Sequence, residues 1–317
     1  MPYHSLPRSV DAWALYLAHA ELPVLGRTAA ELARLAADED RVGGPQLARV
    51  ILHDPMMTLK VLRYLQSHRG KRQNTDITTI EHAVMMLGLR RFFAEFSGLS
   101  AFEDKLAAHP PALHGALRVL YRARHAALYA REWAVMRHDI EVSEVVIAAL
   151  LHDLAEMLIW CFAPDYAQNV ESMQQADRTL RSRDAQHAVL GFALIDLQLA
   201  LVREWNLPPL FLELMDEAHA TQPRVINVAL AARIARHSSH GWHNPALADD
   251  YEAVRKFLGV SQHEVTESVR RATLAAAREW RWYNVAPAAA YWPLLPNAAP
   301  EVRAAGEPVR DPAQIEH

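Results

Sequence analysis

The sequence predicts an all-α fold, a multi-helix bundle with a short helical extension at its C-terminal end. Three observations lead to this prediction. Apolar residues recur at the spacing of amphipathic helices along most of the chain. Capping residues, proline restarts and glycine stops divide this pattern into segments of helical length. No stretch shows the convincing two-residue alternation that is typical of a β-strand.

The first half of the chain is expected to form helices over residues 11–22, 28–39, 46–52, 55–65, 80–87 and 89–104. Two pairs, Thr28 with Glu31 and Thr78 with Glu81, have the spacing of capping boxes. Asp54 followed by Pro55 is typical of an N-cap and a first helical residue. Residues 68–76, HRGKRQNTD, are expected to form a polar basic loop.

The second half is expected to form helices over residues 112–137, 145–163, 165–183, 184–205, 209–219 and 224–237. Two more follow within residues 249–283, separated by Gly259. Ser143 is the expected N-cap of the helix at 145–163, and Ser261 with Glu264 is a third capping box. Beyond Asn284 the chain is rich in alanine and proline, which indicates an irregular or disordered tail.

Composition restricts the partners and the location of the protein. The chain has 317 residues, 51% of them hydrophobic, which is ample for a large core. A formal net charge of -4 gives no general attraction to nucleic acid or anionic membranes. Cys161 is the single cysteine, the N-terminus lacks a secretory signal pattern, and no apolar run approaches the roughly 20 residues of a membrane span. We therefore expect a cytoplasmic protein without a membrane partner.

The segment at residues 145–164, VVIAALLHDLAEMLIWCFAP, is expected to be a helix enclosed by other helices, because it leaves no broad polar face. It nevertheless carries His152 and Asp153 side by side. A carboxylate buried without a partner is costly, so Asp153 must meet a metal ion, a cation or hydrogen-bond donors. His125 lies near the middle of the preceding predicted helix, and antiparallel packing of the two helices could bring both histidines to one point.

This order, a lone histidine followed by His-Asp, resembles the HD superfamily of metal-dependent phosphohydrolases. Five successive blocks resemble one branch of it, the HDOD domain, a bacterial signalling output module: ELPVLGRTAAELARL, ARVILHDPMMTLKVLRYLQS, ITTIEHAVMMLGLRRF, ALLHDLAEML and HAVLGFALIDLQLALVREWNLPP. YEAVRKFLGVSQHEV resembles a C-terminal extension that is common after this domain. The resemblance implies an HDOD domain at 16–222, a helical extension packed on it at 223–284, and the irregular tail at 285–317.

The same resemblance places His125, His152 and Asp153 at the metal-ligand positions of active relatives. Ala232 falls where those enzymes supply a later aspartate. Extra ligands could come from His187, Asp216 and His219. Because the carboxylate count is short, we expect no catalytic residue and no cofactor, and a divalent metal ion only if the site is retained.

These observations favour a non-enzymatic bacterial signal-transduction or regulatory scaffold that binds partner proteins. Asp153 would then be held by His125 or by an arginine. The alternative is a metal-dependent phosphohydrolase or phosphodiesterase acting on nucleotides or cyclic nucleotides. A third hypothesis, nucleic-acid binding through the basic residues 69–72, has less support, because four residues usually form a solvated turn. The sequence leaves the partner and the oligomeric state open.

Overall fold

The computed structural model describes residues 6–68, 78–177, 179–216 and 221–292. Within these residues the chain is helical, and its β-structure is limited to one isolated parallel bridge between Val24 and Ala101. The all-α prediction is therefore confirmed. The basic residues 69–72 and most of the tail lie outside the described residues.

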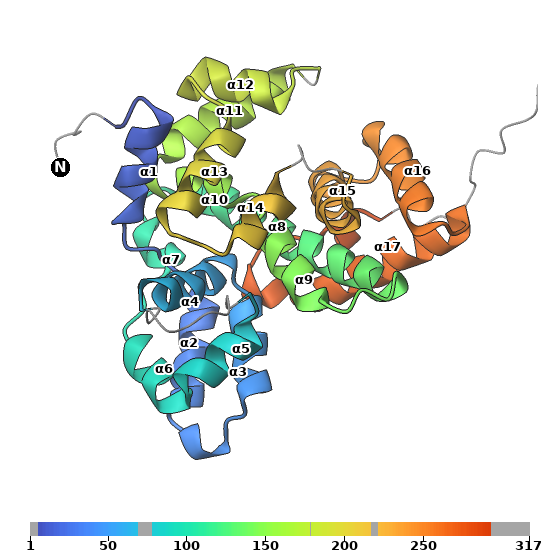
Figure 1. Cartoon of the computed structure of the whole chain (residues 1–317). Coiled ribbons are helices and arrows are strands. Elements are labelled where there is room, and N and C mark those ends of the chain that lie inside the picture. The colour runs from blue at the N-terminus through green and yellow to red at the C-terminus, as the bar shows by residue number, and fades with distance from the viewer. Residues whose placement is uncertain (1–5, 69–77, 178, 217–220, 293–317) are drawn as a thin grey trace, which may run out of the picture.

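The N-terminal part is a group of short helices, drawn in blue and cyan in Figure 1. They are α1 (Val10–Ala18), α2 (Gly26–Ala36), α3 (Gly44–Leu52), α4 (Pro55–Ser67), α5 (Ile80–Leu87), α6 (Leu89–Glu95) and α7 (Phe102–Lys105). The start of α4 is as predicted, since the Asp54 carboxylate accepts hydrogen bonds from the N–H groups of Met56 and Met57. Asp54 also accepts from the Leu25 N–H at 2.7 Å, which ties α4 to the start of α2.

Two of the predicted capping boxes are wrong. Thr28 lies buried inside α2, which begins at Gly26, because the Glu103 carboxylate reaches the Gly26 N–H at 2.9 Å from a distant part of the chain. The N-cap of α5 is Thr79, whose hydroxyl accepts from the His82 N–H, so the cap lies one residue later than predicted, although the helix itself has the predicted bounds, 80–87. The third box, Ser261 with Glu264, is confirmed in both of its hydrogen bonds.

The long helix α8 (Pro110–Met136) lies at the centre of the molecule (Figure 1). It packs against α9 (Val142–Leu150), α10 (Leu154–Phe162), α15 (Pro223–Ser238) and α17 (Gln262–Ala277). The approach of α10 is close enough to require glycine at position 115. A Cβ atom there would lie 2.3 Å from the Trp160 ring.

Three segments predicted as single helices are divided in the structure. They are 145–163, 184–205 and 89–104, the last of which forms α6 and α7. Residues 151–153 form a turn between α9 and α10, and α9 begins at Val142, which leaves Ser143 inside the helix rather than at its N-cap. Gly191, in the left-handed conformation at φ 85°, separates α12 (Ser182–Leu190) from α13 (Leu194–Glu204). These two helices meet at a bend of 74°. The remaining helices of this region are α11 (Pro164–Ala176) and α14 (Pro209–Met215).

The apolar segment Val142–Phe162 is, by length and composition alone, long enough to cross a membrane, and α12 with α13 passes the same test only as a bent pair. This corrects the expectation that no apolar run approaches that length. However, 78% of its apolar window is buried inside the protein, and core helices of soluble proteins satisfy the same criteria. The segment is therefore weak evidence for a membrane span.

The C-terminal helices α15, α16 (Ala246–Leu258) and α17 form one side of the molecule (Figure 1). Three buried hydrogen bonds fasten α17 to α8: Tyr121 to the Ala276 carbonyl, Tyr129 with Thr273, and Trp133 to Ser268. Two short 3-10 helices follow, Trp280–Trp282 and Ala288–Tyr291. The predicted domain boundaries at 222 and 284 stay predictions.

Candidate functional site

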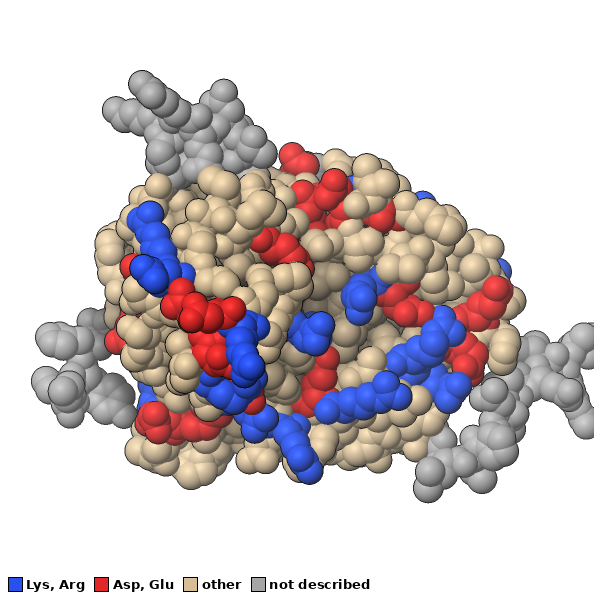
Figure 2. Space-filling view, turned by 90° about the horizontal axis from the view of Figure 1, so that it is seen from below, with Lys and Arg blue, Asp and Glu red and all other residues tan. Residues whose placement is uncertain are grey.

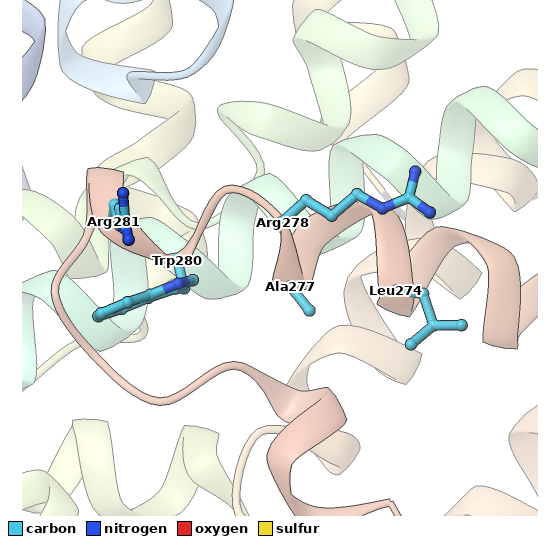
Figure 3. Close-up of a pocket in the computed structure, with 5 residues that line it drawn as sticks. All are labelled: Leu274, Ala277, Arg278, Trp280 and Arg281. Atoms are coloured by element: carbon cyan, nitrogen blue, oxygen red, sulfur yellow. The ribbon is translucent and has the colours of Figure 1, made fainter.

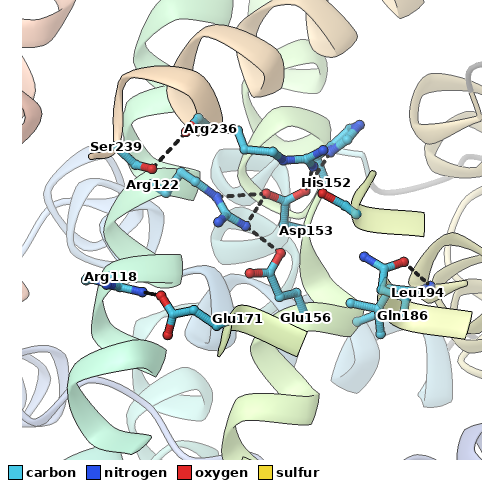
Figure 4. Close-up of polar contacts among 12 residues, drawn as sticks. Arg118, Arg122, His152, Asp153, Glu156, Glu171, Gln186, Leu194, Arg236 and Ser239 are labelled. Carbon is cyan, nitrogen blue, oxygen red and sulfur yellow. Dashed lines mark hydrogen bonds and ion pairs between the residues drawn. The ribbon is translucent and has the colours of Figure 1, made fainter. Parts of the chain in front are cut away.

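Asp153 lies in the turn between α9 and α10, and both of its carboxylate oxygens have protein donors (Figure 4). The Arg122 guanidinium donates to Oδ2 through Nε at 3.1 Å and Nη2 at 2.7 Å. Arg236 donates to Oδ1 through Nη2 at 2.9 Å. The side chain of Asp153 is only 9% exposed, so these contacts replace water. Of the two partners that the sequence left open for this carboxylate, His125 or an arginine, the structure has arginines.

Glu156 completes this cluster from one turn further along α10. Arg122 donates to its Oε2 at 2.6 Å, and therefore binds two carboxylates at once. Burial alone would lower the pKa of Arg122, but the Glu156 and Asp153 carboxylates raise it above its ordinary value. Burial would likewise raise the pKa of Asp153, but Arg236 and Arg122 hold it well below its usual range. Two guanidinium groups thus face two ionised carboxylates, and the cluster is close to neutral as a whole.

His152 joins the cluster through one ring nitrogen. Its Nδ1 lies 3.0 Å from Asp153 Oδ1, and an ionised carboxylate can only accept, so Nδ1 carries the proton. In the neutral imidazole the other nitrogen, Nε2, is then an acceptor and the only atom of this ring that could bind a metal. The adjacent residues His152 and Asp153 are therefore brought together as predicted.

His125 does not join them. It is buried on α8, where its Nδ1 lies 2.9 Å from the Tyr121 carbonyl and its ring centroid lies 4.4 Å from that of Tyr121. Because a carbonyl accepts, Nδ1 again carries the proton, and the buried Nε2 has no partner among the described residues. Burial lowers the pKa of His125 to about 4, which keeps the ring neutral near pH 7.

Two of the three predicted extra ligands lie in the described part of the chain. His187 lies exposed on α12, Asp216 is the residue that ends α14, and His219 lies outside the described residues. Across the part of the chain that the structure describes, no three His, Cys, Asp or Glu side chains are grouped so that they could hold a metal ion. Retention of a metal at His125, His152 and Asp153 stays a prediction.

The residues that sequence reasoning missed are the two arginines. Arg122 is three positions before His125 on α8, and Arg236 is four positions after Ala232 on α15. Residues four apart share a helix face, so Arg236 lies next to the position where the resemblance expects an aspartate. The helix that would supply a carboxylate in an active relative supplies a cation here. The four-residue spacing between Ala232 and Arg236 is the sequence feature that could have indicated this arginine.

A second buried charge cluster lies on another side of α8. The Arg124 guanidinium donates to both Glu279 oxygens, at 2.7 and 2.9 Å, and His53 Nε2 lies 3.4 Å from the same carboxylate. The Tyr283 hydroxyl donates to the His53 carbonyl, and the His53 ring stacks on Trp282 with centroids 4.4 Å apart. This cluster joins the end of α3, the middle of α8 and the residues that follow α17.

The fold and the site define an all-helical protein with a buried histidine–aspartate pair that is held by arginines. A family model for the HDOD domain matches residues 22–221, and the chain belongs to this family. None of the proteins with curated descriptions matches the chain.

Two solved structures share the fold. The first is a virulence factor from Campylobacter jejuni subsp. jejuni, 18% identical with a TM-score of 0.63, and the match covers 84% of this chain and 97% of that one. The second is the MmoQ response regulator from Methylococcus capsulatus str. Bath, 18% identical with a TM-score of 0.58, covering 78% of this chain and 98% of that one. At this identity the likeness concerns the fold alone.

Proposed function

We propose that this protein is a non-enzymatic regulatory module of a bacterial signalling pathway, and that it acts by binding a partner protein. The observation that carries the proposal is the occupation of Asp153 by Arg122 and Arg236. A metal ion at this carboxylate would have to displace at least one guanidinium, and two cations near the carboxylate oppose the approach of a third. The proposed location is the cytoplasm.

Membership of the HDOD family supports the signalling part of the proposal. One structural neighbour is named a response regulator, which fits the same role. On the face seen in Figure 2, basic side chains form a band across the lower half, and acidic side chains lie close beside them.

The C-terminal end of α17 offers a surface for the partner, which we call the α17-end surface. Its residues line a shallow hollow of about 520 Å³ (Figure 3): Leu274, Ala277, Arg278, Trp280 and Arg281. Trp280 is 44% exposed and Leu274 is 43% exposed, so both apolar side chains are accessible to a partner. Tryptophan and arginine are the residue types most enriched at energetically important interface positions.

The charges of the α17-end surface indicate which side chains a partner would place there. Arg270 and Arg271, earlier on α17, pair with Glu267 and Glu132. Arg278 and Arg281 have no carboxylate within ion-pair distance among the described residues, although the Arg281 guanidinium lies 5.8 Å from the Trp280 ring centroid. We therefore propose a partner segment that combines carboxylates with an apolar side chain.

The test is co-purification of the tagged protein from its native host, with quantification of each recovered protein. The doubly substituted variant Trp280→Ala/Arg281→Glu should recover at least about tenfold less of the specific partner, as expected for loss of an interface hot spot. Arg270→Glu is the matched control, because this arginine is exposed on the same helix outside the hollow, and it should leave recovery unchanged.

The purified protein is also assayed for bound metal and for hydrolysis of phosphodiesters and nucleotides. Stoichiometric metal together with hydrolysis that His152→Ala abolishes would replace the proposed function by the phosphohydrolase alternative. Equal recovery of partners by all three forms of the protein would instead reject the α17-end surface alone.

A further inference from the structure

Two basic side chains of α4 line a cavity that shares no residue with the α17-end surface. Lys60 and Arg63 are three residues apart and therefore share one face of α4. The cavity has a volume of about 570 Å³, within the range of roughly 300–1,000 Å³ that is typical of small-molecule sites. It lies where the end of α1, α4, the end of α6 and the end of α13 meet.

Both cations are half-buried and lack a direct counter-charge. Lys60 Nζ donates to the Leu22 carbonyl at 2.8 Å, and Arg63 Nη2 donates to the Ala18 carbonyl at 2.7 Å. Neither has a carboxylate within ion-pair distance among the described residues. Burial lowers the pKa of Lys60 and that of Arg63, which reflects the cost of holding these charges away from water.

Carboxylates do line the cavity, but they are exposed to solvent. They are Glu21, Glu95 and Glu204. Of these, Glu21 acts on Lys60 only through the longer-range attraction that partly opposes the effect of burial on the Lys60 pKa. The half-buried charge inside the cavity is therefore positive, whereas the negative charge of its lining lies on exposed side chains.

Trp205 supplies a second, independent feature of the cavity. Its side chain is 7% exposed and lines the cavity, and the Arg63 guanidinium lies 4.6 Å from its ring centroid. The buried indole Nε1 has no hydrogen-bond acceptor among the described residues. An indole N–H can only donate, and a buried donor without an acceptor is costly.

Two donors on one cavity thus have unused capacity: the ammonium of Lys60 and the guanidinium of Arg63. Oxygen atoms that carry negative charge satisfy both, and charge-assisted hydrogen bonds of this kind are strong. The remaining lining is partly apolar and aromatic, with Leu22, Tyr64, Phe96 and Leu99.

We propose that this cavity binds a small organic anion, a carboxylate or a phosphate monoester, that carries a short apolar or aromatic body. The anionic group contacts Lys60 and Arg63, and the body lies against the aromatic lining. This site is separate from His152 and Asp153 and does not depend on the α17-end surface.

The experiment is isothermal titration of the full-length protein, at constant ionic strength, with three probes of similar size: benzoate, phenyl phosphate and benzyl alcohol. At least one of the two anions should bind saturably with 1:1 stoichiometry, and the two anions distinguish a carboxylate ligand from a phosphate ligand. Benzyl alcohol, which has the ring without the charge, should show no saturable binding. The absence of saturable binding by both anions overturns the proposal.

Variants connect the binding to this cavity. Arg63→Gln should weaken anion binding at least about tenfold, as expected for loss of a charge-assisted contact. Ser97→Trp places a large side chain in the lining while it leaves both cations and their hydrogen bonds intact, and it should abolish binding even if Arg63→Gln proves unstable. Arg203→Gln removes an exposed arginine of α13 outside the lining and should bind as the wild type does. Anion binding that survives Ser97→Trp with unchanged affinity refutes the assignment.

Discussion

The two buried arginines of α8, Arg122 and Arg124, are two residues apart and face different sides of the helix, about 200° around its axis. Their side chains are almost equally buried, 12% and 11% exposed. Arg122 points to the family site at Asp153, whereas Arg124 points to Glu279 after α17. The same helix therefore supplies one buried cation to each of two separate charge clusters.

The two clusters differ in how many partners each charge has. Arg122 binds Asp153 and Glu156, and Asp153 in turn binds Arg236, so that removing one member leaves every other charge with a partner or with access to water. Among the described residues, Arg124 has Glu279 as its single carboxylate and otherwise only the Leu52 carbonyl, at 3.3 Å. The cluster at Asp153 is therefore redundant, whereas the Arg124–Glu279 pair, which we call the C-terminal clamp, is not. Stability should therefore depend more on Glu279 than on Asp153.

The largest effect is expected for Glu279→Gln. This change leaves the buried Arg124 without a counter-charge, and breaking a buried pair in this way costs about 3–5 kcal/mol. The free energy of unfolding, measured in urea at pH 7, should fall by that amount. The residues after α17 should also become accessible to limited proteolysis. A loss smaller than that of Asp153→Asn would contradict the comparison.

Acid should reduce the stability that the Arg124–Glu279 pair contributes. Arg124 and His53 hold the pKa of Glu279 at about 2 despite its burial, compared with 4.5 for an ordinary glutamate. Between these values the unfolded state binds more protons, so the stability from Glu279 is complete above pH 4.5 and is lost as the pH falls towards 2. A shift of this size corresponds to about 3 kcal/mol. The difference in unfolding free energy between wild type and Glu279→Gln should therefore shrink steadily between pH 5 and pH 3. A difference that does not change with pH would show that Glu279 is not ionised in the fold.

A smaller effect is expected for Asp153→Asn. Arg122 keeps Glu156, and Arg236, which is 40% exposed, can turn to solvent, so we expect a loss of about 2 kcal/mol, between a buried and a surface pair. Replacing both members of the buried pair, Arg122→Met with Asp153→Leu, should recover part of this loss, because no charge of that pair then remains buried. The measurement is urea unfolding of Asp153→Asn and of the double variant beside the wild type.

The sequence predicted best what depends on neighbours in the chain. The caps at Asp54 and Ser261 were predicted correctly because their donors lie within three residues. The start of α2 was not, because its cap is Glu103, on a separate helix. The need for a partner at Asp153 was predicted for the same local reason, the cost of a buried carboxylate, but the choice between a metal ion, His125 and an arginine stayed open. Which of the 33 lysines and arginines would serve depends on packing between α8, α10 and α15, which no local pattern contains.

The contacts of His125 likewise could not be predicted from the sequence. The resemblance indicates a ligand position, and the order of residues along the chain is right for it. The direction of its ring, however, is set by Tyr121 one turn earlier and by the packing of α17 against α8. The α17 contact involves Ala276, which lies outside the residues that the HDOD family model matches. The position of the site along the chain could therefore be predicted from the sequence, but the hydrogen bonds and ion pairs of its residues could not.

The smallest effect is expected for Arg236→Ala, and it tests the redundancy most directly. Arg236 is 40% exposed, so its contact with Asp153 should contribute less than about 1 kcal/mol, as exposed ion pairs do. Asp153 keeps Arg122 and His152, and its pKa should stay below the ordinary range. Urea unfolding of the wild type and Arg236→Ala, with and without 0.5 M NaCl, measures this contribution and its dependence on salt. Salt should weaken the Arg236 contact and leave the Arg122 contact largely unaffected. A loss as large as that of Glu279→Gln would mean that Arg236 is an essential member of the cluster, and the family site would then be no more redundant than the C-terminal clamp.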